Sequence, residues 1–240
     1  MTADRPSLFD PPADPPIDPL LARWTEVDSY LVDTLSPPDA ALAAALDASD
    51  AADVPPLQVP PNQGKLLQLL GLAVGARRIL EVGTLGGYST IWLARALPPD
   101  GELVTLEIEP RYAGVAQANV DRAGLGDRVD IRIGPALAGL TALRREGGAP
   151  FDLVFVDADQ ERCAEYVDHA VTLARRGAVI VVDDTVRAGA VADESATDAR
   201  VLGVRRLHDA LAADPRVEAT ALQTVGRQGW GGFTLAVVVG

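Results

Sequence analysis

The sequence predicts an α/β protein whose doubly wound sheet is mostly parallel and closes with an antiparallel hairpin. Short apolar runs are each followed by a segment with helical spacing, a pattern typical of a parallel sheet covered by helices on both faces. A glycine-rich turn follows the first of these runs. The last two runs are too close together for a parallel crossover, so the final strand must be antiparallel.

The N-terminal region is expected to lie outside the sheet. Residues 1–19 are rich in proline and aspartate, which predicts a disordered tail because few apolar side chains can offset the entropy of ordering. Residues 20–54 are predicted to form two helices, one over Leu20–Leu35 and a second that Asp39 caps and that ends near Ala52. These helices form a cover or a partner surface, or they simply pack on the main sheet.

The first strand and its turn are the most informative stretch. An extended linker, Pro55–Asn62, and an amphipathic helix, Gln63–Val74, lead to a strand over Arg78–Val82. Gly83–Gly87 then breaks the strand, and Tyr88–Leu97 recovers helical spacing. Glycines allow positive φ and close approach of a ligand, and a helix N-terminus presents unpaired N–H groups. The turn is therefore a candidate cofactor cradle; a tight turn without a ligand is the alternative.

The alternation of strands and helices then repeats. Further strands are predicted over Leu103–Glu107, Val129–Ile133, Phe151–Val156 and Ala178–Val182. Helices are predicted between and after them over Pro110–Ala123, Pro135–Arg145, Glu161–Arg175 and Ala199–Ala213. The closing hairpin is predicted as Val217–Thr224 and Gly232–Val239, joined by a loop over residues 225–231.

The composition narrows the class of partner. A formal net charge of -13 disfavours binding to nucleic acid or to an anionic membrane, so a small-molecule partner is expected. No apolar stretch approaches a membrane span and no secretory signal is evident, which favours a cytoplasmic location. The single cysteine, Cys163, excludes an intrachain disulfide. Lys65 is the only lysine, which leaves almost no candidate for a catalytic amine.

Acidic residues follow three of the predicted strands. Glu107 ends the second strand, where its carboxylate can accept hydrogen bonds from both ribose hydroxyls of an adenosyl cofactor. A solvated glutamate is the alternative, and this feature does not separate NAD from S-adenosylmethionine. Asp157 and Asp159 end the fourth strand, and Asp183 and Asp184 end the fifth.

The fourth and fifth strands should be neighbours, which would bring several carboxylates into one small volume. Crowded like charges are destabilising unless a cation compensates them, and an oxygen-only set suits Mg²⁺ or Ca²⁺ better than zinc. Aspartates that cap helices or lie solvated in loops are the alternative.

Several ordered motifs with matching spacing resemble one family. They are PNQGKLLQLL, RILEVGTLGGYST, VTLEIEP, GPAL, FDLVFVDAD, VIVVDD and QTVGRQGWGGFTLAVVV. The chain from about Val59 to its end is similar to the cation-dependent class I O-methyltransferases of the catechol and caffeoyl-CoA type, especially their small bacterial members. The resemblance implies a methyltransferase domain over 55–240 with a Rossmann-like seven-stranded sheet, and a homodimer. It also implies S-adenosylmethionine as methyl donor, a divalent cation (Mg²⁺, or else Ca²⁺ or Mn²⁺) and a small aromatic acceptor.

The resemblance also implies roles for individual residues. The expected cofactor contacts are Val59, Glu81, Gly83, Thr84, Ser89, Glu107, Ala136 and Asp159. The expected metal ligands are Asp157, Asp183 and Asp184.

Two positions depart from the family pattern. Gln160 stands where the family has a lysine that resembles a general base, and an amide cannot take a proton. Asp184 stands where the family usually has asparagine; it keeps a ligand oxygen and adds a negative charge, so we expect cation binding to survive or strengthen. Catalysis then depends on the cation, with Asp157 beside the reacting oxygen and the proton passing to water or to a ligand aspartate.

Other interpretations stay open. Gln160 can mark an acceptor acidic enough to need no base, such as a carboxylate or an electron-poor phenol. A non-catalytic S-adenosylmethionine-binding protein is a second possibility, and a nicotinamide oxidoreductase, disfavoured by the missing G-x-G-x-x-G spacing, is a third. Trp230 is expected in the hairpin loop, stacked on an acceptor or packed in a dimer interface. Arg187 is expected to pair with the aspartates or an anionic acceptor, or to lie solvated.

Overall fold

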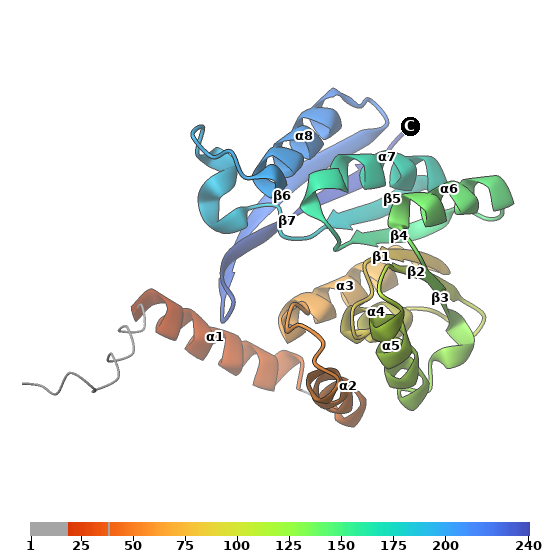
Figure 1. Ribbon diagram of the computed structural model, residues 1–240, viewed down its shortest axis with the longest axis vertical. Coiled ribbons are helices and arrows are strands. Elements are labelled where there is room, and N and C mark those ends of the chain that lie inside the picture. Colours follow the sequence, from red (N-terminus) through yellow and green to blue (C-terminus); the bar gives the residue numbers. More distant parts are fainter. Residues whose placement is uncertain (1–18, 38) are drawn as a thin grey trace, which may run out of the picture.

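A seven-stranded sheet with the order β3-β2-β1-β4-β5-β7-β6 forms the centre of the protein. The computed structural model describes residues 19–37 and 39–240 (Figure 1). The strands are β1 (Arg78–Val82), β2 (Glu102–Glu107), β3 (Val129–Ile133), β4 (Phe151–Val156), β5 (Ala174–Val182), β6 (Val217–Gly226) and β7 (Gly229–Val238). Strands β1 to β5 pair in parallel, whereas β7 is antiparallel to both β5 and β6. The predicted fold class is confirmed.

Helices cover both faces of the sheet. The helices of the described residues are α1 (Pro19–Leu35), α2 (Ala40–Ala51), α3 (Pro61–Ala73), α4 (Tyr88–Ala94), α5 (Pro110–Arg122), α6 (Ala136–Glu146), α7 (Cys163–Leu173) and α8 (Ala199–Ala213), of which α3 to α8 cover the sheet. Short 3-10 turns η1 (Gly126–Arg128), η2 (Gln160–Arg162) and η3 (Arg187–Ala192) complete the chain. Among the described residues no helix is long and apolar enough to cross a membrane.

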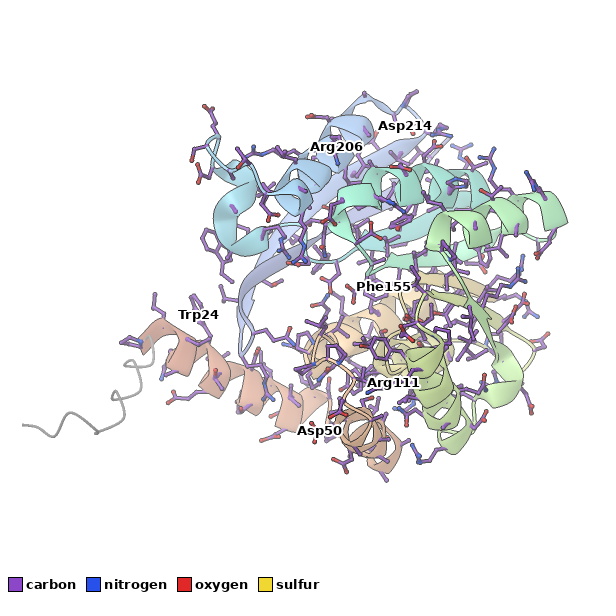
Figure 2. The ribbon with its side chains drawn as sticks, viewed as in Figure 1. Trp24, Asp50, Arg111, Phe155, Arg206 and Asp214 are labelled. Carbon is purple, nitrogen blue, oxygen red and sulfur yellow. The ribbon has the colours of Figure 1, made fainter. Side chains whose placement is uncertain are left out.

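Two apolar cores lie on opposite faces of the sheet. Helices α3, α4 and α5 pack on one face, and the fully buried Phe155 of β4 belongs to this core (Figure 2). Helices α6, α7 and α8 pack on the other face around Leu140 and Leu207. The central strands β1, β2 and β4 are therefore buried on both sides, as their continuous apolar runs predict, whereas the edge strand β6 is largely exposed.

The two N-terminal helices do not lie on the sheet. Asp39 caps α2 by accepting hydrogen bonds from the Ala41 and Leu42 N–H groups, as expected. Helix α2 contacts α4 and α5, where Arg111 donates to the carbonyl of Ala52 (Figure 2). Helix α1 lies beside the β6–β7 hairpin (Figure 1). The disordered tail predicted for 1–19 lies outside the described residues, except that Pro19 begins α1.

Asp28 of α1 holds this helix to the hairpin. Its buried carboxylate accepts hydrogen bonds from the Arg227 N–H (2.9 Å) and from Asn62 Nδ2 of α3 (3.0 Å). A Cβ at Gly226 would meet Asp28 Oδ2 at 2.3 Å, so only glycine allows this approach. One carboxylate thus joins α1, α3 and the hairpin.

Several predicted boundaries were wrong, among them the end of the Tyr88–Leu97 helix, which stops at Ala94. The hairpin strands continue to Gly226 and from Gly229, so the expected loop over 225–231 is a two-residue turn and Trp230 lies on β7. Helix α7 ends at Leu173 instead of near Arg175, and β5 begins at once. Arg175 turns toward the Asp152 carboxylate and the Val74 carbonyl, which draws this segment alongside β4.

The turn after β1 requires glycine. Gly83 has φ +97, and a Cβ there would meet the Asp157 carbonyl oxygen at 2.0 Å. The turn can therefore pack directly against the end of β4. Strands β2 and β4 flank β1 on opposite sides, so the order of the sheet reverses here, where α/β proteins bind ligands.

Beneath this turn, Glu81 of β1 is fully buried in a cluster of hydroxyl groups. Its carboxylate accepts hydrogen bonds from Ser89 (2.7 Å), Thr90 (2.6 Å) and Thr105 (2.7 Å). Burial raises the pKa of Glu81 to about 7, against the lowering effect of the three hydroxyls. The cluster ties the start of α4 to β1 and β2 and so fixes the path of the glycine turn.

Replacing Glu81 with glutamine should remove a pH dependence of stability. The folded protein holds a proton that the unfolded chain, with its ordinary pKa of 4.5, releases. The free energy of unfolding therefore falls as pH rises between these two pKa values, by at most about 1.4 kcal/mol per pH unit. In urea unfolding, we expect wild type to lose stability relative to Glu81→Gln over this interval. Glu218→Gln, on an exposed strand position, is the control; parallel wild-type and Glu81→Gln curves would contradict the expectation.

Candidate active site

A cavity of about 1190 Å³ lies at the carboxyl ends of β1, β2, β4 and β5. The glycine turn, the segment before α3, the turn after β4 and the β6–β7 hairpin form its walls. Seven of the eight predicted cofactor residues line it: Val59, Gly83, Thr84, Ser89, Glu107, Ala136 and Asp159. The predicted metal ligands and Gln160 line the same cavity.

Glu81 is the exception. It is fully buried below the turn and is not among the residues that line the cavity. The physical reason is that its carboxylate binds three hydroxyl groups of the protein. Ser89, which does line the cavity, donates one of those bonds, so Glu81 positions a residue of the wall.

Glu107 is held rigidly at the end of β2. Its Oε2 accepts hydrogen bonds from the backbone N–H groups of Thr84 (3.1 Å) and Leu85 (2.8 Å) in the glycine turn. Its Oε1 accepts one from the Glu109 N–H (2.9 Å). Bonds from three amides set the direction of the carboxylate and leave it acceptor capacity toward the cavity.

Asp159 is positioned by a residue that the sequence did not indicate. Tyr166 of α7 donates its hydroxyl proton to Asp159 Oδ1, and Arg162 Nε lies 3.9 Å from the other carboxylate oxygen. Burial raises the pKa of Tyr166, and the bond to Asp159 raises it further, so the phenol stays a donor. The tyrosine lies on an apolar face of α7, where sequence reasoning assigns it to the core.

The carboxylates of β4 and β5 face one another across the cavity floor. Burial raises the pKa of Asp157 well above its ordinary value, and repulsion from Asp183, Glu81 and Asp184 adds to this rise. Burial also raises the pKa of Asp183, whereas its polar contact with the Gln63 side chain and its hydrogen bond from the Asp184 N–H (2.8 Å) lower it. Gln63 Nε2 is buried without a hydrogen-bond partner among the described residues. The predicted meeting of acidic residues from two neighbouring strands is present.

Asp184 is contacted by two side chains that can donate hydrogen bonds, Arg187 and Gln160. Arg187 Nη1 donates to Asp184 Oδ2, and Gln160 Nε2 lies 3.4 Å from the same oxygen. Across 19–37 and 39–240, no three His, Cys, Asp or Glu side chains are arranged as a ready set of metal ligands. The donors nevertheless suit a hard divalent cation in their chemistry, because all are carboxylates and their mutual repulsion would be relieved by positive charge.

The sole lysine is remote from this chemistry. Lys65 Nζ lies 5.6 Å from the centre of the Trp92 ring and donates to Gln68 Oε1 (3.0 Å) on its own helix. It does not line the cavity. Gln160, at the position where the family resemblance implies a lysine base, instead directs its side-chain amide toward Asp184 Oδ2.

Asp28, Gln63 and Tyr166 also line the cavity, although sequence reasoning did not assign them to the site. Asp28 bonds to Arg227, far along the chain, and Tyr166 bonds to Asp159, outside its own helix. The helical spacing of apolar residues cannot indicate such contacts. The one available signal was that Asp28 lies on the same helix face as Val32 and so points inward.

Comparison with known proteins identifies the family. The sequence matches the O-methyltransferase family over residues 39–236. The catechol O-methyltransferase of Mycobacterium tuberculosis is 54% identical over 213 residues, which are 89% of this chain and 95% of that protein. The catechol O-methyltransferase of Niastella koreensis is 49% identical over 215 residues, which are 90% of this chain and 97% of that protein.

Solved structures agree with these relatives. An O-methyltransferase from Bacillus cereus in complex with SAH superposes with a TM-score of 0.89 at 50% identity, covering 91% of this chain and 99% of the other. A Streptomyces achromogenes O-methyltransferase of tomaymycin synthesis, in complex with SAM, gives a TM-score of 0.89 at 51% identity, with coverage of 92% and 99%. The chain belongs to this family and is an S-adenosylmethionine-dependent O-methyltransferase.

Proposed function

We propose that this O-methyltransferase methylates a hydroxyl group of a small catechol-like acceptor with the help of a divalent cation. The observation that carries the proposal is the convergence of Asp157, Asp183 and Asp184 in the cavity that also contains Glu107 and the glycine turn. Two relatives at about half identity are catechol O-methyltransferases, which supports the same acceptor class.

We assign the adenosyl end of the donor to the side of the cavity formed by β1 and β2. The Glu107 carboxylate faces the cavity and is fixed by three backbone amides, which suits it to accept hydrogen bonds from ribose hydroxyls. The Gly83 turn lets the ligand approach the backbone closely. Val59, Thr84, Ser89, Ala136 and Asp159 complete the proposed wall.

We assign the cation to Asp157, Asp183 and Asp184. Mg²⁺ is the best candidate for an all-carboxylate set, with Ca²⁺ or Mn²⁺ as substitutes. When bound, a divalent cation lowers the pKa of a hydroxyl that coordinates it. The three aspartates would hold it beside the acceptor, and the cavity would keep the acceptor oxygen in line with the methyl group.

Gln160 leaves the acceptor without a nearby amine base. Its amide can donate or accept a hydrogen bond but cannot accept a proton, and Lys65 lies outside the cavity. The hydroxyl proton would then pass to water or to a carboxylate. This arrangement favours acceptors that ionise easily, so a carboxylate or an electron-poor phenol is the alternative acceptor class.

Methyl transfer to catechol should depend on a divalent cation. With S-adenosylmethionine and catechol, we expect methylated catechol by mass spectrometry, abolition of turnover by EDTA and rescue by Mg²⁺. Phenol, which has one hydroxyl and cannot chelate, should react at least about tenfold more slowly. Full turnover in excess EDTA would rule out the cation but would leave the methyltransferase activity intact.

A lysine at position 160 should change the pH profile. In wild type, we expect kcat/KM to follow ionisation of the acceptor, because no amine takes the proton. Gln160→Lys supplies a titrating group and should shift the profile toward lower pH. Gln160→Met, which has similar length and no proton acceptor, is the matched control and should keep the wild-type profile. An unchanged profile in Gln160→Lys would contradict this assignment of Gln160.

We also propose a homodimer that uses α1. Val27, Leu31 and Leu35 lie on one face of this helix and are 47%, 37% and 67% exposed, an apolar stripe typical of an interaction surface. Trp24 projects from the same helix (Figure 2).

Light scattering after size exclusion should give twice the mass of one chain. Leu35→Glu should shift the protein toward monomer, whereas Thr34→Glu, an exposed neighbour off the stripe, should not. A monomeric wild type would overturn the dimer, and an unaffected Leu35→Glu variant would place its interface elsewhere.

A further inference from the structure

Arg187 turns back onto the carboxylate that ends β5. It is the first residue of η3, three positions after Asp184, and its Nη1 donates to Asp184 Oδ2. Gln160 Nε2 approaches the same oxygen at 3.4 Å. One of the three proposed cation ligands is therefore already paired with a positive side chain of the protein.

The backbone of this segment is folded to make the pairing possible. Asp184, Arg187 and Ala188 have φ values of 54, 55 and 51, in the left-handed region that non-glycine residues seldom occupy. Such conformations persist only where surrounding structure imposes them. The turn that presents Arg187 to Asp184 is thus held in place by its neighbours.

Those neighbours come from β7 and α8. A Cβ at Gly189 would meet the Trp230 ring at 2.5 Å, so the indole packs directly on the turn. Trp230 is itself fixed by a hydrogen bond from its Nε1 to Gln223 Oε1 (3.0 Å). Arg205 of α8 donates to the carbonyls of Val191 (3.0 Å) and Ala190 (3.3 Å). Two elements remote in sequence therefore brace the turn.

The ion pair between Asp184 and Arg187 changes the net charge beside Asp157. Asp184 adds a negative charge beside Asp157, whose pKa its repulsion helps to raise. The Arg187 guanidinium neutralises that charge and gives the pair no net charge. Its Nε is buried without a hydrogen-bond partner among the described residues, so the guanidinium is held by its contact with Asp184 and not by a full set of acceptors.

We propose that Arg187 is a built-in counter-ion that competes with the divalent cation for Asp184. The inference rests on the proposed cation site. To bind the cation, Asp184 must give up its ion pair with Arg187. The affinity for the cation therefore depends on how much more strongly Asp184 interacts with the cation than with Arg187. The additional charge of Asp184 therefore does not strengthen cation binding as a bare carboxylate would.

Direct measurement of Mn²⁺ binding tests this competition. Free Mn²⁺ is followed by electron paramagnetic resonance in the presence of S-adenosylhomocysteine, with wild type, Arg187→Gln, Asp184→Asn and the double variant. We expect Arg187→Gln to bind Mn²⁺ about three- to fivefold more tightly than wild type, within the range that a partly exposed ion pair allows. In the Asp184→Asn background the same substitution should change the Kd less than about twofold.

Arg200→Gln is the matched control. Arg200 lines the same cavity and lies 3.8 Å from Glu161, away from Asp184. Its loss removes a positive charge without freeing the ligand, so Mn²⁺ affinity should stay at the wild-type value. An equal gain in Arg200→Gln, or an equal gain from Arg187→Gln in both backgrounds, would reduce the effect to general charge repulsion and overturn the proposal.

The remaining outcomes separate this inference from the proposed function. Equal Mn²⁺ affinity of wild type and Arg187→Gln overturns the competition and leaves the cation site intact. No Mn²⁺ binding by any of the variants overturns both. Binding of S-adenosylhomocysteine, measured by calorimetry on each variant, reports the donor site independently and confirms that each variant is folded.

Discussion

The site depends on the burial of negative charge where the sheet reverses direction. Asp157 and Glu81 lie at or near the ends of β4 and β1, and burial raises the pKa of both. Carboxylates in such surroundings lose hydration and repel one another, so each must find a hydrogen bond, a proton or a positive partner. The contacts of Glu81, Glu107, Asp159 and Asp184 are examples of these solutions.

The solutions differ between the two sides of the cavity. On the β1 and β2 side, hydroxyl and amide groups satisfy Glu81 and Glu107, which makes this wall rigid. On the β4 and β5 side, Asp184 pairs with Arg187. Asp157 is buried, and the charged groups that act on it are other carboxylates. The carboxylates of the first wall already have hydrogen-bond partners within the protein. This wall is therefore rigid, which suits binding of the methyl donor. The second wall has an excess of negative charge, which suits the proposed cation.

The sequence was sufficient for the fold and for the position of the cavity at the carboxyl ends of the strands. Apolar runs of strand length, glycine at Gly83 and acidic residues after the strands placed the site, since parallel strands end at a common edge. The sequence was insufficient where contacts between residues far apart in the chain decide where an element ends or how deeply a side chain is buried. Arg175 bonds across to Asp152 and so ends α7 early, and the pairing of Trp230 on β7 replaces the expected loop. Glu81 lies in the motif that leads into the glycine turn, where we expected a residue of the cavity wall. It is fully buried among the hydroxyl groups of Ser89, Thr90 and Thr105, which only the packed structure brings together.

The contact between Asp28 and Arg227 has a consequence for how the protein is made. These residues are separated by 199 positions, so the helix that emerges early from the ribosome cannot reach its partner until almost the whole chain has been synthesised. During translation α1 must wait for the hairpin, while the parallel strands can already assemble. Asp28 of α1 and the hairpin both line the cavity, so this wall cannot be complete before the C-terminal strands have been synthesised.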